Sequence, residues 1–309
     1  MTIPVSHLRV SSVTHSTRSI QATRRIQGGA ALVLALVVAC VPAQAQDATA
    51  QAYHERSFIL AANTKCRLFD ASVEQALGAA ALQTRGVLLR AGHETTQVGA
   101  VASRATGQGR AVSCGDPALQ ETSGRILHAF SRWSRAARLE FPASSKSWRV
   151  DRFAGSKTGW RMVQDSGVGT AAVRFGLAGL SPEETSPTVV VSFSGRSRPY
   201  AARLVMRDVD LLPRAHAVSA GQAQMPPFSG RKAFFAARQM DAPDTLLGEG
   251  KRRGEAWEFP QEAMVRVTQL DPREPFWIEF LFRDDSVARV PFEAGDAAAA
   301  EAFLGLGAI

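Results

Sequence analysis

The spacing of apolar residues changes once along the chain, near the segment Phe141-Pro142-Ala143-Ser144-Ser145. Before this segment apolar side chains recur every three or four residues, as in helices, and after it they alternate with polar residues, as in strands. A chain that places its helices first and its strands afterwards belongs to the α+β class. We therefore expect a helical domain over 46–140, a linker over 141–146 and an antiparallel β domain over 147–309.

The first half of the chain carries start and stop signals for helices. Asp70 is placed to cap a helix over 71–90, and Gly92 to end it in the left-handed conformation. Asp116-Pro117 has the composition of a cap followed by a first helical residue. The sequence predicts helices over 52–62, 71–90 and 95–112, and a further helix that begins at 117.

Alternating apolar and polar residues mark the strands of the second half. Over 200–207 the apolar side chains fall on one face and Arg203 and Arg207 on the other. This alternation favours an antiparallel sheet or sandwich with one wet face, followed by a short C-terminal helix over 296–304. The sheet is expected to include 148–150, 160–163, 171–175, 188–193, 200–207, 263–269, 275–283 and 286–292. The long connections are 211–230 and 241–254, and 231–240 fits either a helix or a strand.

The first 45 residues have the pattern of a secretory signal peptide. Four arginines and no acid precede an apolar run, Gly28 to Val41, that is shorter than the roughly 20 residues needed to span a membrane. The run is followed by Ala43-Gln44-Ala45, a small-x-small cleavage pattern. We expect removal of 1–45, a mature chain that begins at Gln46, and a periplasmic or secreted protein.

Two other interpretations of this leader stay open. Val37-Val38-Ala39-Cys40 resembles a lipobox, which would make Cys40 the acylated first residue of a membrane-anchored lipoprotein. Thr23-Arg24-Arg25 resembles the start of a twin-arginine signal. Because Cys40 lies inside the apolar run and a complete cleavage pattern follows it, we expect membrane attachment only if Cys40 is acylated.

Two cysteines remain after the leader, Cys66 and Cys114. An even number of cysteines in an exported chain predicts a disulfide. The bridge would join the entry of the helical pair 71–112 to its exit. A Cys-x-x-Cys redox motif is absent from the sequence.

The charge of the chain is positive but modest. Removal of the leader arginines lowers the formal net charge from +8 to about +4. The excess is concentrated in 122–215, which carries 15 basic and 7 acidic residues. This stretch indicates either an anionic partner or a solvated sheet face with outward arginines. Export argues against nucleic acid as that partner.

The order Cys66-Arg67-Leu68-Phe69, an Ala-rich helical pair around Gln83-Thr84-Arg85-Gly86 and Leu89-Arg90-Ala91-Gly92, and then Cys114 resembles a group of uncharacterised secreted proteins of alphaproteobacteria. The resemblance covers about the first 90 residues of the mature chain. It implies export and the disulfide. The group has no established activity, so the resemblance implies nothing about mechanism.

Familiar catalytic motifs are incomplete in this sequence. Lys157-Thr158-Gly159 matches a triplet of penicillin-binding proteins, but the Ser-x-x-Lys of that family should precede it, whereas Ser229 to Lys232 follows. The histidines share no metal-ligand spacing, and neither a metal nor a cofactor is expected. The tryptophans together with the central arginines suit a surface for polysaccharide or nucleic acid, but the positions of the tryptophans on alternating strand patterns and on an apolar helix face favour burial in the core.

One group of candidates for acid–base chemistry lies near the connection 211–230. Asp208 and Asp210 are two residues apart and would share a face of a strand, with His216 shortly after them. These residues define an alternative hypothesis, an exported hydrolase. The favoured hypothesis is a non-catalytic, envelope-associated binding or scaffold protein whose partner is an envelope protein or a cell-wall component. The sequence leaves the partner and the oligomeric state open.

Overall fold

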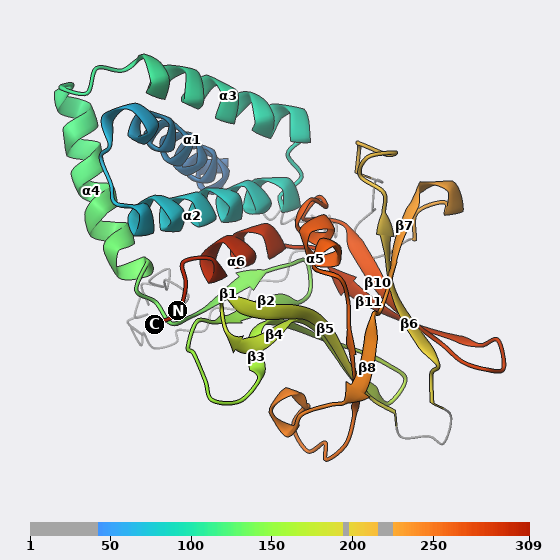
Figure 1. Cartoon of the computed structure of the whole chain (residues 1–309). Coiled ribbons are helices and arrows are strands. Elements are labelled where there is room, and N and C mark those ends of the chain that lie inside the picture. Colours follow the sequence, from blue (N-terminus) through green and yellow to red (C-terminus); the bar gives the residue numbers. More distant parts are fainter. Residues whose placement is uncertain (1–42, 194–197, 216–224) are drawn as a thin grey trace, which may run out of the picture.

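The computed structural model describes residues 43–193, 198–215 and 225–309, with side chains from residue 48 onward. The described chain forms a helical layer followed by two antiparallel sheets and a short final helix (Figure 1). The expected α+β class is therefore confirmed. Cys40 and nearly all of the expected leader lie outside the described residues, so export and lipidation stay predictions.

Four helices form the helical layer, and local signals explain their ends. The Asp70 carboxylate accepts a hydrogen bond from Val73 N at 2.9 Å, and the Asp116 carboxylate accepts one from Ala118 N at 2.8 Å. Gly92 takes the left-handed φ of +97° after the second helix. The helices are α1 (Ala43–Cys66), α2 (Ala71–Arg90), α3 (Thr95–Ala111) and α4 (Pro117–Trp133). The first is longer than the 52–62 expected.

The disulfide between Cys66 and Cys114 is present, as expected. It joins the last residue of α1 to the turn between α3 and α4, with the two Cα atoms 5.4 Å apart. Ile59, Leu77 and Leu119 are buried beside it in a small cluster that joins α1, α2 and α4. The bridge therefore closes the end of the helical layer that lies far from the start of α3 (Figure 1).

Every strand pairing in the two sheets is antiparallel. The larger sheet has the order β1-β2-β3-β4-β5-β9-β8, and the smaller has the order β11-β10-β6-β7. The larger sheet comprises β1 (Arg138–Pro142), β2 (Ser147–Asp151), β3 (Gly159–Val168), β4 (Ala171–Ser181), β5 (Glu184–Ser192), β8 (Arg238–Asp241) and β9 (Glu255–Glu258). The smaller sheet comprises β6 (Ala201–Arg207), β7 (Arg231–Phe235), β10 (Pro275–Leu281) and β11 (Val287–Glu293).

Two expectations about elements need correction. Residues 141–146 are not a separate linker, because Phe141 pairs with Trp148 in the β1–β2 hairpin and Ala143 N donates to Lys146 O across its turn. The segment 263–269 is largely helical and belongs to α5 (Gln261–Thr268), which follows Pro260. Its buried residues Ala263, Met264 and Val267 have helical rather than alternating spacing.

The final helix, α6 (Ala297–Leu304), lies between α2 and the larger sheet (Figure 1). Phe175 of one sheet contacts Phe276 of the other, with ring centroids 5.4 Å apart, in the same core that contains α6. On the helical side, Asp296 before α6 forms an ion pair with Arg90 of α2. One core thus joins both sheets, and α6 attaches the helical layer to it.

Candidate functional site

A cleft of about 660 Å³ lies where the helical layer meets the smaller sheet. Its walls come from α2, from the start of α3, from the chain that leaves β6 and from the loop between α5 and β10. Junctions of this kind are common places for ligand sites. The charged residues that line it are Arg85, Glu94, Arg207, Arg214, Asp271, Arg273 and Glu274.

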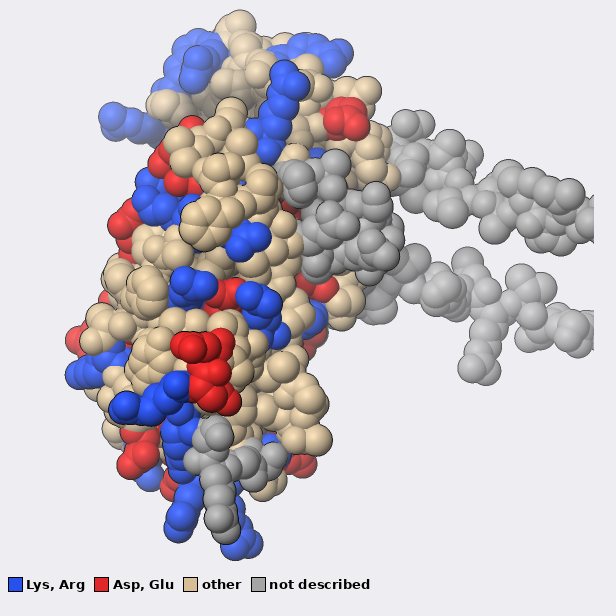
Figure 2. All heavy atoms as spheres, turned by 90° about the vertical axis from the view of Figure 1, so that its right-hand side faces the viewer, with Lys and Arg blue, Asp and Glu red and all other residues tan. Residues whose placement is uncertain are grey.

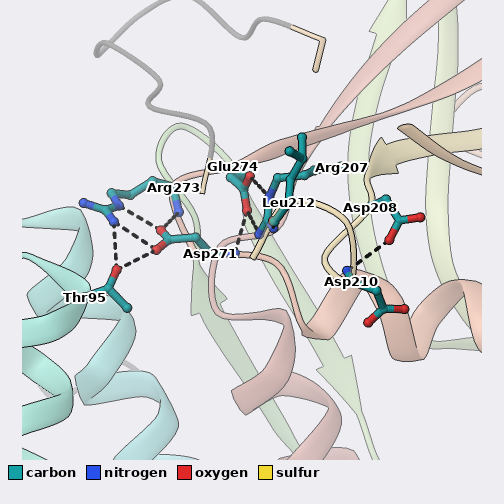
Figure 3. A network of polar contacts seen from close by, with 8 residues as sticks. All are labelled: Thr95, Arg207, Asp208, Asp210, Leu212, Asp271, Arg273 and Glu274. Atoms are coloured by element: carbon teal, nitrogen blue, oxygen red, sulfur yellow. Dashed lines mark hydrogen bonds and ion pairs between the residues drawn. The ribbon is translucent and has the colours of Figure 1, made fainter. Parts of the chain in front are cut away.

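A buried ion pair forms one wall of the cleft. Arg207, the last residue of β6, donates to both carboxylate oxygens of Glu274 at 2.6 and 2.8 Å. Both side chains are almost fully buried, and Arg207 also donates to the Leu212 carbonyl. Glu274 in turn accepts from Asp271 N at 2.8 Å. The bidentate geometry therefore fixes the loop before β10 against the end of β6 (Figure 3).

A second ion pair faces the start of α3. Arg273 donates to the Asp271 carboxylate from its backbone N, Nε and Nη2 at 2.8 to 3.0 Å. The Thr95 hydroxyl lies 3.5 Å from the same carboxylate (Figure 3). Burial alone would raise the pKa of Asp271, but the hydrogen bonds and charge of Arg273, together with the charge of Arg85, outweigh it and hold that pKa below its usual value. Asp271 is therefore ionised at neutral pH and cannot act as a proton donor.

Two guanidinium groups of the cleft remain uncommitted. Arg85 on α2 is half-buried, and Arg214 beyond β6 is exposed. Neither forms an ion pair or side-chain hydrogen bond with any residue that the structure describes, although the charge of Arg85 acts on Asp271. Both line the cleft, together with the polar side chains of Thr95, Thr96 and Gln269. Among the described residues, the cleft thus presents two guanidinium groups whose N–H donors have no acceptor, beside carboxylates that already accept hydrogen bonds.

The acid–base candidates of the sequence do not assemble in this cleft. The strand β6 ends at Arg207, and the Asp208 carboxylate accepts from Asp210 N at 3.0 Å and Leu211 N at 3.3 Å, which makes a turn. Asp210 pairs with Arg266 of α5 at 3.0 Å. Neither carboxylate lines the cleft, and in Figure 3 both lie on the far side of Leu212 from Asp271. His216 lies outside the described residues.

Several basic residues of 122–215 form ion pairs with acids from elsewhere in the chain. Arg125 pairs with Glu55, Arg203 with Glu279, and Arg207 with Glu274. On the face seen in Figure 2, basic and acidic side chains are interspersed. This agrees with the interpretation of a solvated sheet face.

The remaining motifs of the sequence belong to the strands and the core. Gly159 of the Lys157-Thr158-Gly159 triplet is the first residue of β3, and Trp148, Trp257 and Trp277 are buried. Within the described ranges, no three His, Cys, Asp or Glu side chains come together as metal ligands. No helix in that part of the chain is both long and apolar enough to cross a membrane.

Asp271-Pro272-Arg273-Glu274-Pro275 carries much of the cleft but was not singled out by sequence analysis. Its Asp-Pro start is a turn signal, and its three charges within four residues are the signal that could have drawn attention to it. Arg85 lies in the quoted motif Gln83-Thr84-Arg85-Gly86.

Comparisons with protein-family models, with curated proteins and with solved structures found no match to this chain. The resemblance to secreted alphaproteobacterial proteins therefore stays a prediction.

Proposed function

We propose that this chain is an exported, non-catalytic binding protein of the cell envelope, and that the cleft at the junction of helices and sheets receives an envelope component. The observation that carries the proposal is the division of charge in the cleft. Asp271 and Glu274 are held by Arg273 and Arg207, whereas Arg85 and Arg214 form no side-chain hydrogen bond or ion pair within the described chain; Arg85 acts on Asp271 only through its charge. Such a site offers recognition groups rather than a mobile proton.

Export is supported by two independent features. The leader combines a basic start, a short apolar run and a small-x-small end. The Cys66–Cys114 bridge is of a kind that persists in oxidising compartments and is rare in the cytoplasm. We favour a soluble periplasmic or secreted protein, with attachment through an acylated Cys40 as the alternative.

The hydrolase alternative has weaker support. The Asp208 carboxylate accepts hydrogen bonds from backbone amides of its own turn, and Asp210 forms an ion pair with Arg266 outside the cleft lining. General acid–base catalysis needs a titratable group within reach of a reacting atom, and the described part of the chain provides no such pair here.

Site-specific photocrosslinking in the native cell tests the proposal. A benzophenone amino acid at Thr96, an exposed residue of α3 that lines the cleft, should form an adduct in the envelope fraction. The matched control carries the same group at Ala111, the exposed last residue of the same helix, outside the cleft lining. Adducts of equal yield from both positions, or none from Thr96, would contradict a binding role for the cleft.

A further inference from the structure

We propose that the cleft recognises a carboxylate or phosphate group of its ligand, held between Arg85 and Arg214. This inference rests on the proposed binding function and names the chemistry of the ligand. A guanidinium presents its N–H groups as a planar fork that matches the oxygens of carboxylates and phosphates.

The hydrogen bonds inside the cleft explain why these two arginines are left over. Asp271 Oδ1 accepts two bonds from Arg273, and its Oδ2 accepts a third and faces the Thr95 hydroxyl. Glu274 Oε1 accepts from Arg207, and its Oε2 accepts from both Arg207 and Asp271 N. The oxygens of both carboxylates thus accept hydrogen bonds from other donors. Arg85 acts on Asp271 only through its charge, so the N–H groups of Arg85 and Arg214 have no acceptor among the described residues and can bind an external anion.

The charge count points the same way. Four arginines and three acids line the cleft, and two of the arginines are committed to two of the acids. The remaining acid is Glu94, which is exposed at the start of α3. The uncommitted groups therefore carry a net positive charge, which suits an anionic ligand.

The two arginines differ in how firmly they are held. Arg85 is half-buried on α2, a helix that packs against α6 next to the buried Asp296. Arg214 is exposed on the connection after β6. Since a rigid donor loses less conformational entropy on binding, we assign the larger contribution to Arg85.

Calorimetric titration of the mature, disulfide-bonded protein tests this assignment. The probes are inorganic phosphate for a phosphoryl group and succinate for a carboxylate, with glycerol as a neutral control. Arg85→Gln is expected to raise the Kd of the bound probe about tenfold, and Arg214→Gln about threefold. Raising the salt from about 50 to about 500 mM should weaken binding to the wild-type protein.

Two further variants separate recognition from general effects. Arg104→Gln removes one charge from an exposed position of α3 outside the cleft lining, and should leave the Kd within about twofold of the wild type. Arg85→Lys keeps the charge but loses the fork, and should bind more weakly than the wild type and more tightly than Arg85→Gln.

Each outcome has a definite meaning. Binding of phosphate alone identifies a phosphoryl ligand, and binding of succinate alone identifies a carboxylate ligand. The inference is overturned if neither probe binds at about 10 mM, or if the Arg85→Gln, Arg214→Gln double variant binds like the wild type. If neither anion binds but the Thr96 crosslink still forms, only the anion-recognition inference is refuted. If the anions bind but no crosslink forms, the proposed envelope function is refuted.

Discussion

The Arg152 side chain donates hydrogen bonds to backbone carbonyls at the C-terminal ends of two helices. Its guanidinium donates to Ser134 O and Ala136 O just beyond α4, and to Leu306 O and Gly307 O just beyond α6, at 2.6 to 3.2 Å. Only 3% of the residue is exposed. These carbonyls lie beyond the helix ends and have no intrahelical partner, so Arg152 supplies the donors that they lack.

We expect Arg152→Met to lower the free energy of unfolding by about 3 kcal/mol, because it leaves one buried and three partly buried carbonyls without this donor. Arg138→Met is the control, since the Arg138–Asp151 pair is exposed and should contribute less than about 0.5 kcal/mol. Urea unfolding measures both variants. Equal losses would show that Arg152 is no more important than a surface arginine.

Glu279 is the buried centre of an Arg203–Glu279–Arg289 cluster across three strands of the smaller sheet. Burial alone would raise its pKa, but hydrogen bonds from Arg289 and Arg203 outweigh it and hold the pKa below its usual value. A lowered carboxyl pKa in the folded state stabilises the fold above the unfolded-state pKa, and this contribution is lost as the pH falls through the folded-state pKa.

Glu279→Gln should therefore cost about 1–2 kcal/mol of unfolding free energy near pH 7 and progressively less below about pH 4. Chemical unfolding of variant and wild type across that range gives the difference directly. A difference that is independent of pH would refute the assigned role of the ionised carboxylate.

At this scale, capping residues were predictable from sequence and the cleft was not. Asp70 and Asp116 act on amides within three residues, so their roles are local. The cleft is lined by residues from distant parts of the chain: Arg85 lies far from Arg273 in the sequence, and Arg207 lies far from Glu274. Asp208 and Asp210 were wrongly expected on a strand, because the Asp208 side chain captures the amides that would have continued it.

Among the helices, α2 carries two glycines with opposite surroundings. A Cβ on Gly86 would lie 1.8 Å from Asp296 Oδ1, whereas a Cβ on Gly78 would meet nothing within 4 Å. The Asp296 side chain is fully buried and both of its carboxylate oxygens accept hydrogen bonds from Arg90, so the carboxylate has little freedom to move.

Gly86→Ala should thus destabilise the protein by about 2 kcal/mol through overpacking between α2 and α6. Gly78→Ala, on the same helix, should stabilise it by about 0.5–1 kcal/mol because alanine is the better helix former. Thermal unfolding of the pair provides the comparison. Similar effects from both substitutions would contradict close contact at Gly86.

Element types followed from sequence where patterns were strong. The helices α2, α3 and α6 lie close to their expected ranges because period and caps agree. The segment 263–269 was misassigned because a short apolar run fits both helix and strand. The strand β9 owes its place to pairing with distant β5, and β8 pairs in turn with β9.

For the whole molecule, the disulfide and α6 stabilise the helical layer by different means. The bridge closes a loop with a sequence separation of 48 residues, and α6 anchors α2 to the sheets. Cys66→Ser with Cys114→Ser should remove up to about 4 kcal/mol of stability. Reduction of the wild type should lower the unfolding temperature as much as the double substitution does. An unchanged unfolding temperature after complete reduction would argue against a structural bridge.

The proposed envelope function requires an exported, bridged chain, because only such a chain meets an envelope ligand at its cleft. The intact mass of the protein from its native host, before and after reduction with thiol blocking, tests this most directly. We expect a chain that begins at Gln46 and is lighter by two hydrogens until it is reduced; a chain that begins at an acylated Cys40 would move the same protein to a membrane surface. A full-length chain with free thiols at Cys66 and Cys114 would contradict export and, with it, the proposed function.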